Sequence, residues 1–178
     1  MEEESEKNTI GEEIMSWIKP MAIALAAAYL LNAFVIVNAK VPTGSMESTI
    51  LPNDRIVASR LSYLFNPPSR FDIVVFRYPE DLEVLYIKRV IGLPGETVVI
   101  INGNVYIDGV YLEEDSQFKK EQSWGSWGPF VLGEDEYFVL GDHRNNSEDS
   151  RAWTYTLRRE HIIGRAVFKY FRGFEILN

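Results

Sequence analysis

Residues 97–107, which read TVVIINGNVYI, decide the fold class of this chain. Two short runs of β-branched and aromatic residues flank the pair Asn102-Gly103, and such a pair is typical of the two-residue turn of a β-hairpin. Asp108-Gly109 marks another turn directly after the second run. The stretch therefore predicts neighbouring antiparallel strands.

Similar strand-like segments occur on both sides of this hairpin. They span residues 55–58, 72–77, 84–91, 137–140 and 162–171. Residues 147–161 alone have a mixed helical pattern, and residues 113–129, with Ser, Gly, Gln and two Trp, predict a surface excursion. We therefore expect a mainly β fold, an antiparallel and partly closed β-barrel-like domain.

A single long apolar segment precedes the strands. Residues 21–37 read MAIALAAAYLLNAFVIV and carry no charge, and a helix of about 17–20 residues crosses a bilayer core. Pro20 suits the first turn of this helix, and Lys19 and Lys40 bracket it. We expect a leading segment at 1–19, a transmembrane anchor at 20–39 and a β-rich domain at 40–178.

Two alternatives also explain an apolar segment: a buried core helix and a cleavable signal peptide. Val37-Asn38-Ala39 resembles a small-x-small cleavage site. However, residues 1–19 hold six Glu and two Lys, a net charge of −4, whereas signal peptides begin with a short basic region. We therefore favour a retained anchor, although the basic residues on its two sides balance and give no orientation.

Composition excludes several classes of function. The net charge of −8 argues against nucleic-acid binding. The absence of Cys excludes disulfides, thiolate zinc sites and a cysteine nucleophile, and the two His residues are too few for a multi-histidine metal site. Covalent catalysis would therefore need Ser or Thr as the nucleophile.

Such a nucleophile needs a base, and Lys88 is the lysine that best fits this role. A lysine acts near neutral pH only if burial lowers its pKa by about three units from a value near 10.4. Neighbours on a strand point to opposite faces, so either Lys88 or Arg89 should lie in apolar surroundings within residues 84–91. A solvated lysine on an edge strand is the alternative.

Two polar stretches could supply the rest of a site. Residues 141–151, GDHRNNSEDSR, follow an apolar strand, where functional sites often lie, although a turn rich in Asn, Asp and Ser is the simpler interpretation. Residues 41–50, VPTGSMESTI, follow the apolar segment. Ser45 lies eight residues after Val37, at most about 28 Å along an extended chain.

Together these segments resemble the bacterial type I signal peptidases, the Ser-Lys endopeptidases that remove signal peptides from exported proteins. The resemblance rests on PTGSM at 42–46, DRIV at 54–57, DIVVF at 72–76, YIKRVIGLPGE at 86–96 and GDHRNNSEDSR at 141–151, in family order behind one anchor. Three positions depart from the family pattern, which usually has Pro at Ser48, Asn at His143 and Asp at Asn145.

The resemblance implies a role for each matched residue. Ser45 would be the nucleophile, Lys88 the general base, Thr43 a donor of the oxyanion hole beside the Ser45 N–H, and Ser147 the residue that orients the lysine. The residues expected to brace the site are Arg89, Asp142, Arg144, Asp149 and Arg151. Relatives that use histidine have it at the Lys88 position, so we do not expect His143 to be the base. The chemistry needs no metal or cofactor.

The same resemblance implies the setting. The N-terminus would be cytoplasmic and the catalytic domain extracytoplasmic at the cell membrane, where the partners are signal peptides of exported preproteins, the lipid bilayer and the secretion translocon. A membrane-anchored, non-catalytic β-rich binding module is the competing class, and it leaves the order of the segments unexplained.

Two further hypotheses concern single segments. Trp124, Trp127 and Phe130 would either rest on lipid or cap the core. Val37-Asn38-Ala39 meets the specificity of this class of enzyme, which predicts self-cleavage after Ala39.

Overall fold

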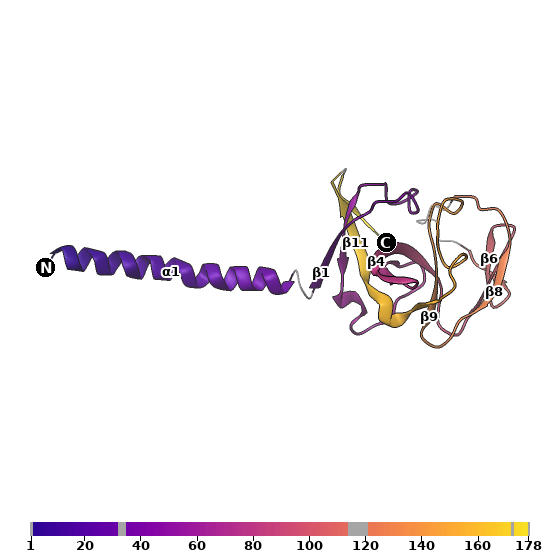
Figure 1. The fold of residues 1–178 in the computed structure, drawn as a ribbon, viewed down its shortest axis with the longest axis horizontal. Helices are drawn as coiled ribbons and strands as arrows, with labels where there is room; N and C mark the ends of the chain where they lie inside the picture. The colour runs from indigo at the N-terminus through magenta and orange to yellow at the C-terminus, as the bar shows by residue number, and fades with distance from the viewer. Residues whose placement is uncertain (1, 32–34, 114–120, 172, 178) are drawn as a thin grey trace. The chain divides into compact units, whose positions relative to one another are not determined.

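The computed structural model describes residues 2–31, 35–113, 121–171 and 173–177, with side chains from residue 12 onward. The chain forms two compact units, residues 1–36 and 37–178, which are described separately. The first unit holds one long helix and the second holds the strands (Figure 1).

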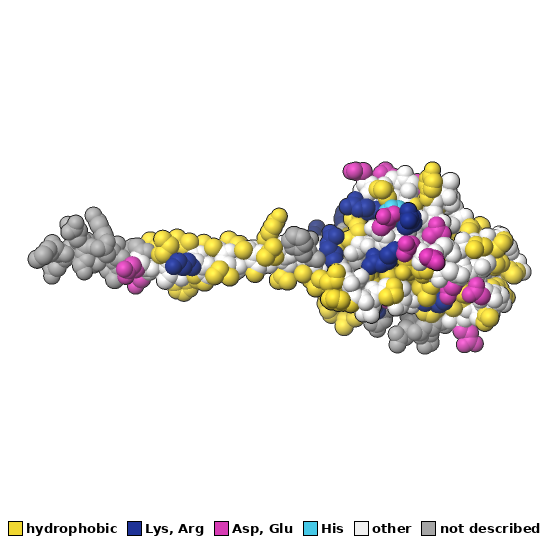
Figure 2. Space-filling model, turned by 90° about the horizontal axis from the view of Figure 1, so that it is seen from below, with side chains coloured by type: hydrophobic (Ala, Val, Ile, Leu, Met, Phe, Trp, Pro, Cys, Tyr) yellow, Lys and Arg dark blue, Asp and Glu magenta, His cyan; other side chains and the backbone are white. Residues whose placement is uncertain are grey.

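The helix of the first unit, α1, runs from Glu2 to Leu30. Its segment Glu12–Leu30 is long and apolar enough to cross a membrane, with a mean hydropathy of 1.2. Hydrophobic side chains cover much of its described surface (Figure 2). The helix starts well before the predicted position, so Pro20 lies inside it and not in its first turn.

The predicted anchor at 20–39 is wrong at its C-terminal end. Ile36–Lys40 forms strand β1, which pairs with β2 (Arg55–Ser59), and Val37 is buried in a core cluster. Ile36 and Val37 are β-branched, so an apolar run at this point suits a strand as well as a helix. Because Ala39 lies inside β1, self-cleavage after Ala39 would require this strand to leave the sheet.

The larger sheet has the strand order β1-β2-β11-β3-β4-β9-β10, with β12 paired to β11. Its other strands are β3 (Ile73–Tyr78), β4 (Asp81–Gly92), β9 (Glu136–Leu140), β10 (Leu157–Arg158), β11 (Ile162–Tyr170) and β12 (Glu175–Ile176). Strand β4 lies between β3 and β9 and pairs antiparallel with both. Short 3-10 helices at Leu61–Tyr63 and Arg159–His161 flank the strands.

The smaller sheet contains the predicted hairpin and has the order β7-β6-β5-β8. Its strands are β5 (Thr97–Ile101), β6 (Asn104–Ile107), β7 (Val110–Tyr111) and β8 (Trp127–Val131). The turn residues Asn102 and Gly103 have φ angles of 50° and 80°, as a two-residue hairpin turn requires. The prediction of a mainly antiparallel β fold is confirmed, and the two sheets are open rather than closed.

The structure differs from two local predictions. Residues 147–161 form turns, β10 and one 3-10 helix instead of an α-helix, because side chains there bind backbone groups: Gly141 N–H donates to Asp149 Oδ2, and Val139 N–H donates to Ser150 Oγ. The predicted excursion at 113–129 includes the start of β8, and residues 114–120 lie outside the described residues.

The three aromatics considered as a lipid-binding patch do not share one environment. Trp127 and Phe130 pack against a core cluster, and the rings of Phe130 and Phe138 lie 4.8 Å apart. Trp124 is 67% exposed. Trp127 and Phe130 therefore cap the core and are partly exposed, whereas Trp124 is mostly open to solvent.

Candidate active site

Ser45 lies in the loop between β1 and β2, and buried neighbours fix this loop. Met46 and Ile50 are fully buried in a core cluster, and Glu47 N–H donates to Gly44 O across a turn. From the other side, His143 N–H donates to Ser45 O at 3.1 Å. The predicted nucleophile is thus held against the polar loop that follows β9.

Lys88 lies on the buried half of β4 and is 3% exposed. It pairs with Val74 of β3, and the ring of Tyr86, on the same face of the strand, lies 5.3 Å from its Nζ. Lys88 is buried because β4 has a neighbouring strand on each side, β3 and β9. The alternative of a solvated edge lysine is therefore excluded.

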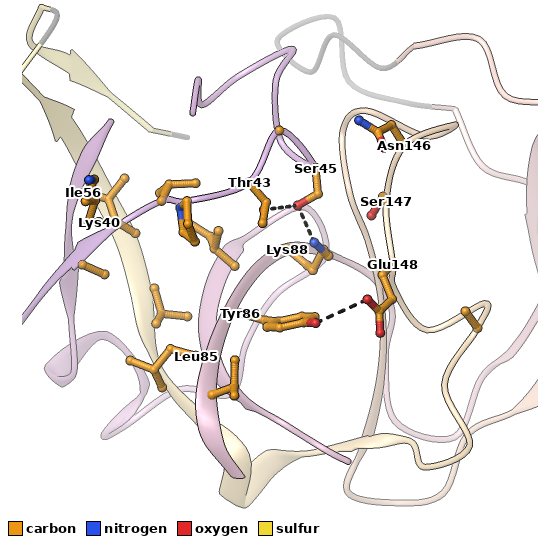
Figure 3. A pocket seen from close by; sticks show the side chains of 18 of the residues that line it. Lys40, Thr43, Ser45, Ile56, Leu85, Tyr86, Lys88, Asn146, Ser147 and Glu148 are labelled. Carbon is orange, nitrogen blue, oxygen red and sulfur yellow. Dashed lines mark hydrogen bonds between the residues drawn. The ribbon is translucent and has the colours of Figure 1, made fainter. Parts of the chain in front are cut away.

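The two predicted catalytic groups are in contact. Lys88 Nζ lies 2.5 Å from Ser45 Oγ and hydrogen-bonds to it (Figure 3). Burial lowers the pKa of Lys88 from 10.5 to about 8, although the nearby carboxylates of Asp149, Glu148 and Asp142 oppose this shift. A substantial fraction of the amine is thus neutral near pH 8 and can accept a proton from the hydroxyl.

The Thr43 side chain lies beside the Ser45 hydroxyl. Its Oγ1 is 3.4 Å from Ser45 Oγ. Among the described residues, no acceptor pairs with the backbone N–H of Ser45. A hydroxyl and an N–H beside the nucleophile are the two donors that an oxyanion hole needs.

Ser147 lines the same groove as the dyad but does not make its predicted contact. Its Oγ is buried and has no hydrogen-bond partner within the described part of the chain. The backbone beside it is crowded, since a Cβ on Gly141 would lie 2.2 Å from Ser147 Oγ and 2.4 Å from Ser45 O. Gly141 is thus needed at this position, a requirement that the sequence analysis missed.

Arg89 and Asp142 form a buried ion pair under the site. Arg89 Nε and Nη2 donate to the two carboxylate oxygens at 2.9 and 2.8 Å, and Arg89 is 2% and Asp142 0% exposed. Thr49 Oγ1 also donates to Asp142. The pair links β4 to the loops that hold Ser45 and His143.

The remaining predicted bracing residues fix the 141–151 loop. Arg151 donates to both carboxylate oxygens of Asp149 at 2.8 and 2.9 Å and to the backbone oxygen of Arg144. Asp149 in turn accepts from Gly141 N–H, and Arg144 Nε donates to Gly141 O. All five bracing residues therefore lie around the site.

The structure does not bring either histidine to the Ser45 hydroxyl. The His143 ring contacts Gly44 O and the carboxylates of Glu47 and Glu121 at 3.2 to 3.4 Å. His161 lies in the 3-10 helix Arg159–His161 and does not line the groove. Within the described residues, Lys88 is the base that contacts the serine.

A groove of about 660 Å³ leads to the dyad. One wall is the segment 39–45, a second is residues 84–88 of β4, and residues 145–148 close the side beyond the dyad (Figure 3). Glu148, which the sequence analysis missed, lies on this side and accepts from Tyr78 OH at 3.0 Å. No sequence pattern indicates this contact, since it depends on the packing of residues 70 positions apart.

Several known proteins are similar to this chain over most of its length. The family model for signal peptidase, peptidase S26, matches residues 14–171. A signal peptidase I of Leptolyngbya laminosa is 41% identical over 89% of this chain and 80% of its own length. A probable signal peptidase I-1 of Synechocystis is 40% identical over 85% of this chain and 79% of its own length.

Two more distant relatives carry the same description. A signal peptidase I of Rickettsia bellii is 30% identical over 95% of this chain and 76% of its own length. The crystal structure of a signal peptidase I from Enterococcus faecalis is 34% identical, covers 56% of this chain and 97% of its own, and has a TM-score of 0.47. The family model and the relatives lead to one conclusion: the chain belongs to the signal peptidase family, peptidase S26, and is a peptidase.

Proposed function

We propose that the chain is a membrane-anchored serine endopeptidase that cleaves N-terminal signal peptides from exported preproteins, with Ser45 as nucleophile and Lys88 as general base. One observation carries this proposal: the buried contact of 2.5 Å between Lys88 Nζ and Ser45 Oγ. Family membership supports the reaction and the substrate class, and this contact supports the assignment of the residues.

The reaction would proceed in two stages. Neutral Lys88 accepts the proton of the Ser45 hydroxyl while Oγ attacks the scissile carbonyl carbon. The C–N bond then breaks as protonated Lys88 gives its proton to the leaving amine. Water, activated by the same lysine, hydrolyses the acyl-serine ester and restores the free enzyme. The lowered pKa of Lys88 supports this role, because an ordinary lysine would remain protonated near neutral pH.

Two donors would stabilise the tetrahedral oxyanion. The Ser45 N–H has no acceptor within the described residues, and Thr43 Oγ1 lies 3.4 Å from Ser45 Oγ. One such donor typically lowers the barrier by about 3 kcal/mol. Ser147 would orient the lysine after proton transfer: the ammonium group has three N–H donors, and the buried Ser147 hydroxyl on the same groove can accept from one of them.

The substrate would lie extended between the two walls of the groove. Segment 39–43 and residues 84–87 both line the groove that leads to the dyad, and each could pair with an added peptide strand. By the family resemblance, the small side chains one and three residues before the scissile bond would enter this groove. Residues after the bond would continue past the dyad toward residues 145–148.

Helix α1 would anchor the enzyme in the cell membrane. Its segment Glu12–Leu30 meets the length and hydropathy of a membrane span. We propose a cytoplasmic N-terminus and an extracytoplasmic catalytic domain, which would meet preproteins as they leave the translocon.

Cleavage of a preprotein by purified full-length variants in detergent tests the proposal. Ser45→Ala and Lys88→Ala should each lower kcat by about 10⁴ or more, since the nucleophile and its base act as a unit. His143→Ala serves as the control and should retain most of the activity. If Ser45→Ala and Lys88→Ala cleaved as fast as the parent, the dyad would be refuted; if the parent itself did not cleave, the binding module would be favoured.

A further inference from the structure

A second pocket, of about 310 Å³, lies beside the substrate groove and has no part in the chemistry above. The two share Asn145, Ser147 and Ala152 as lining residues, so they meet along one short stretch of the polar loop. The other walls of the second pocket are Trp124, Trp127, Arg144 and Arg151. A side chain that passes Ser147 would enter it.

The position of the dyad indicates which part of a substrate reaches this pocket. The wall segments 39–45 and 84–88 of the groove reach the dyad at Ser45 and Lys88, and Figure 3 shows the dyad between Lys40 and the segment Asn146 to Glu148. If the residues before the cleaved bond fill the groove, those after it must leave on the far side of the dyad. They then pass the 145–147 segment, which borders the second pocket.

The charges around the second pocket favour an anion. Arg151 uses Nε and Nη2 on Asp149 and on the Arg144 carbonyl. Its Nη1, which carries two more N–H groups, has no acceptor among the described residues. The described lining residues include the guanidinium groups of Arg144 and Arg151 and no carboxylate.

Two indole rings, Trp124 and Trp127, form the rest of the pocket. The guanidinium carbon of Arg151 lies 5.0 Å from the centre of the Trp127 ring, a cation–π contact between two walls of the pocket. The segment that carries Trp124 is tied to the polar loop, since Asn145 Nδ2 donates to Gln122 O at 2.9 Å. Trp124 itself is 67% exposed and forms an outer wall.

We propose that this pocket binds an acidic side chain carried by one of the first three residues after the cleaved bond. Arg151 Nη1 donates to the incoming carboxylate, and Trp124 and Trp127 cover its methylene groups. The pocket thereby selects preproteins by the start of the mature chain. This inference rests on the proposed function, because it requires a peptide cleaved at Ser45.

The test uses the purified full-length chain in detergent and preproteins that differ only at the first three positions after the cleavage site. Each position carries Glu, Gln or Lys in turn. We expect kcat/KM to be about fivefold or more higher with Glu than with Gln at one position, and lowest with Lys, the effect of one partly screened charge-assisted hydrogen bond. Raising the salt concentration to 1 M should reduce the ratio of kcat/KM between the Glu and Gln preproteins.

Exposed Trp124 provides a matched pair of variants. Trp124→Glu places a carboxylate in the pocket and should reverse the order, so that Lys becomes the best residue at that position. Trp124→Gln has nearly the same shape without the charge and should keep the order of the parent.

The inference is overturned if Glu and Gln differ by less than twofold at all three positions, or if Trp124→Glu keeps the preference of the parent. Failure of the proposed function has a different readout, since no preprotein would then be cleaved, or Ser45→Ala would cleave them all.

Discussion

Replacing Lys88 with methionine should stabilise the folded protein while abolishing its activity. The folded state lowers the pKa of Lys88 from 10.5 to about 8, and at about 1.4 kcal/mol per pH unit this costs about 3 kcal/mol at pH 7. Methionine has a similar length and carries no charge, so it removes this cost. The variant also loses the hydrogen bond to Ser45, which is worth about 1 kcal/mol. The free energy of unfolding should therefore rise by about 2 kcal/mol.

The sign of this effect depends on pH. Between pH 8 and 10.5 the unfolded chain binds more protons at Lys88 than the folded chain does, so this group makes wild-type stability rise with pH through that window. Above the window both states are neutral at this position, and the cost of burying the charge disappears. The advantage of Lys88→Met should therefore fall by about 3 kcal/mol between pH 7 and pH 11.

Urea unfolding of both full-length proteins in the same detergent, followed by tryptophan fluorescence at pH 7, 9 and 11, measures this difference. The other titratable groups are the same in both proteins, so their contributions to the pH dependence of stability largely cancel in the difference. A Lys88→Met variant that is less stable than wild type at pH 7, or a difference that does not change with pH, would refute the burial of a charged lysine at this site.

Three further predictions concern the surroundings of the dyad. Thr43→Val should lower kcat by about 10² with little change in KM, because it removes a donor used mainly in the transition state; an unchanged kcat would exclude Thr43 from the oxyanion hole. Gly141→Ala should lower kcat by at least about tenfold, since its Cβ would lie 2.4 Å from Ser45 O. The control is Gly95→Ala, whose Cβ meets nothing within 4 Å; its φ of 82° makes alanine destabilising there, but Gly95 does not line the groove, so kcat should stay at the parent value. Asp142→Asn should destabilise the fold by about 3 kcal/mol in urea, because it removes the carboxylate charge that faces the buried Arg89 guanidinium; a loss below 1 kcal/mol would contradict this.

Much of the fold could be predicted because its signals are local. The Asn102-Gly103 turn and the β-branched runs on both sides of it define a hairpin within eleven residues. The end of the helix could not be predicted in this way. Apolar residues continue from α1 into β1, and only pairing with β2, which lies about twenty residues later, separates the strand from the helix.

The candidate site residues could be predicted from the ordered segments, but their contacts could not. Ser45 and Lys88 are 43 positions apart, and their contact depends on how the loop after β1 packs against β4. Residues 147–161 were misjudged, because the Asp149 and Ser150 side chains bind backbone groups and turns replace the expected helical structure. The second pocket also depends on tertiary packing, since its walls come from β8, the segment before β8 and the polar loop.

The pH dependence of kcat/KM for preprotein cleavage, measured for wild type and His143→Ala, tests the central claim most directly. With Lys88 as the base, kcat/KM should rise about tenfold from pH 7 to pH 9 with a midpoint near 8, because the neutral fraction of this amine rises in that range, and His143→Ala should show the same midpoint. A midpoint near 6.5 that disappears in His143→Ala, or a profile that stays flat across this range, would contradict an uncharged lysine as the base.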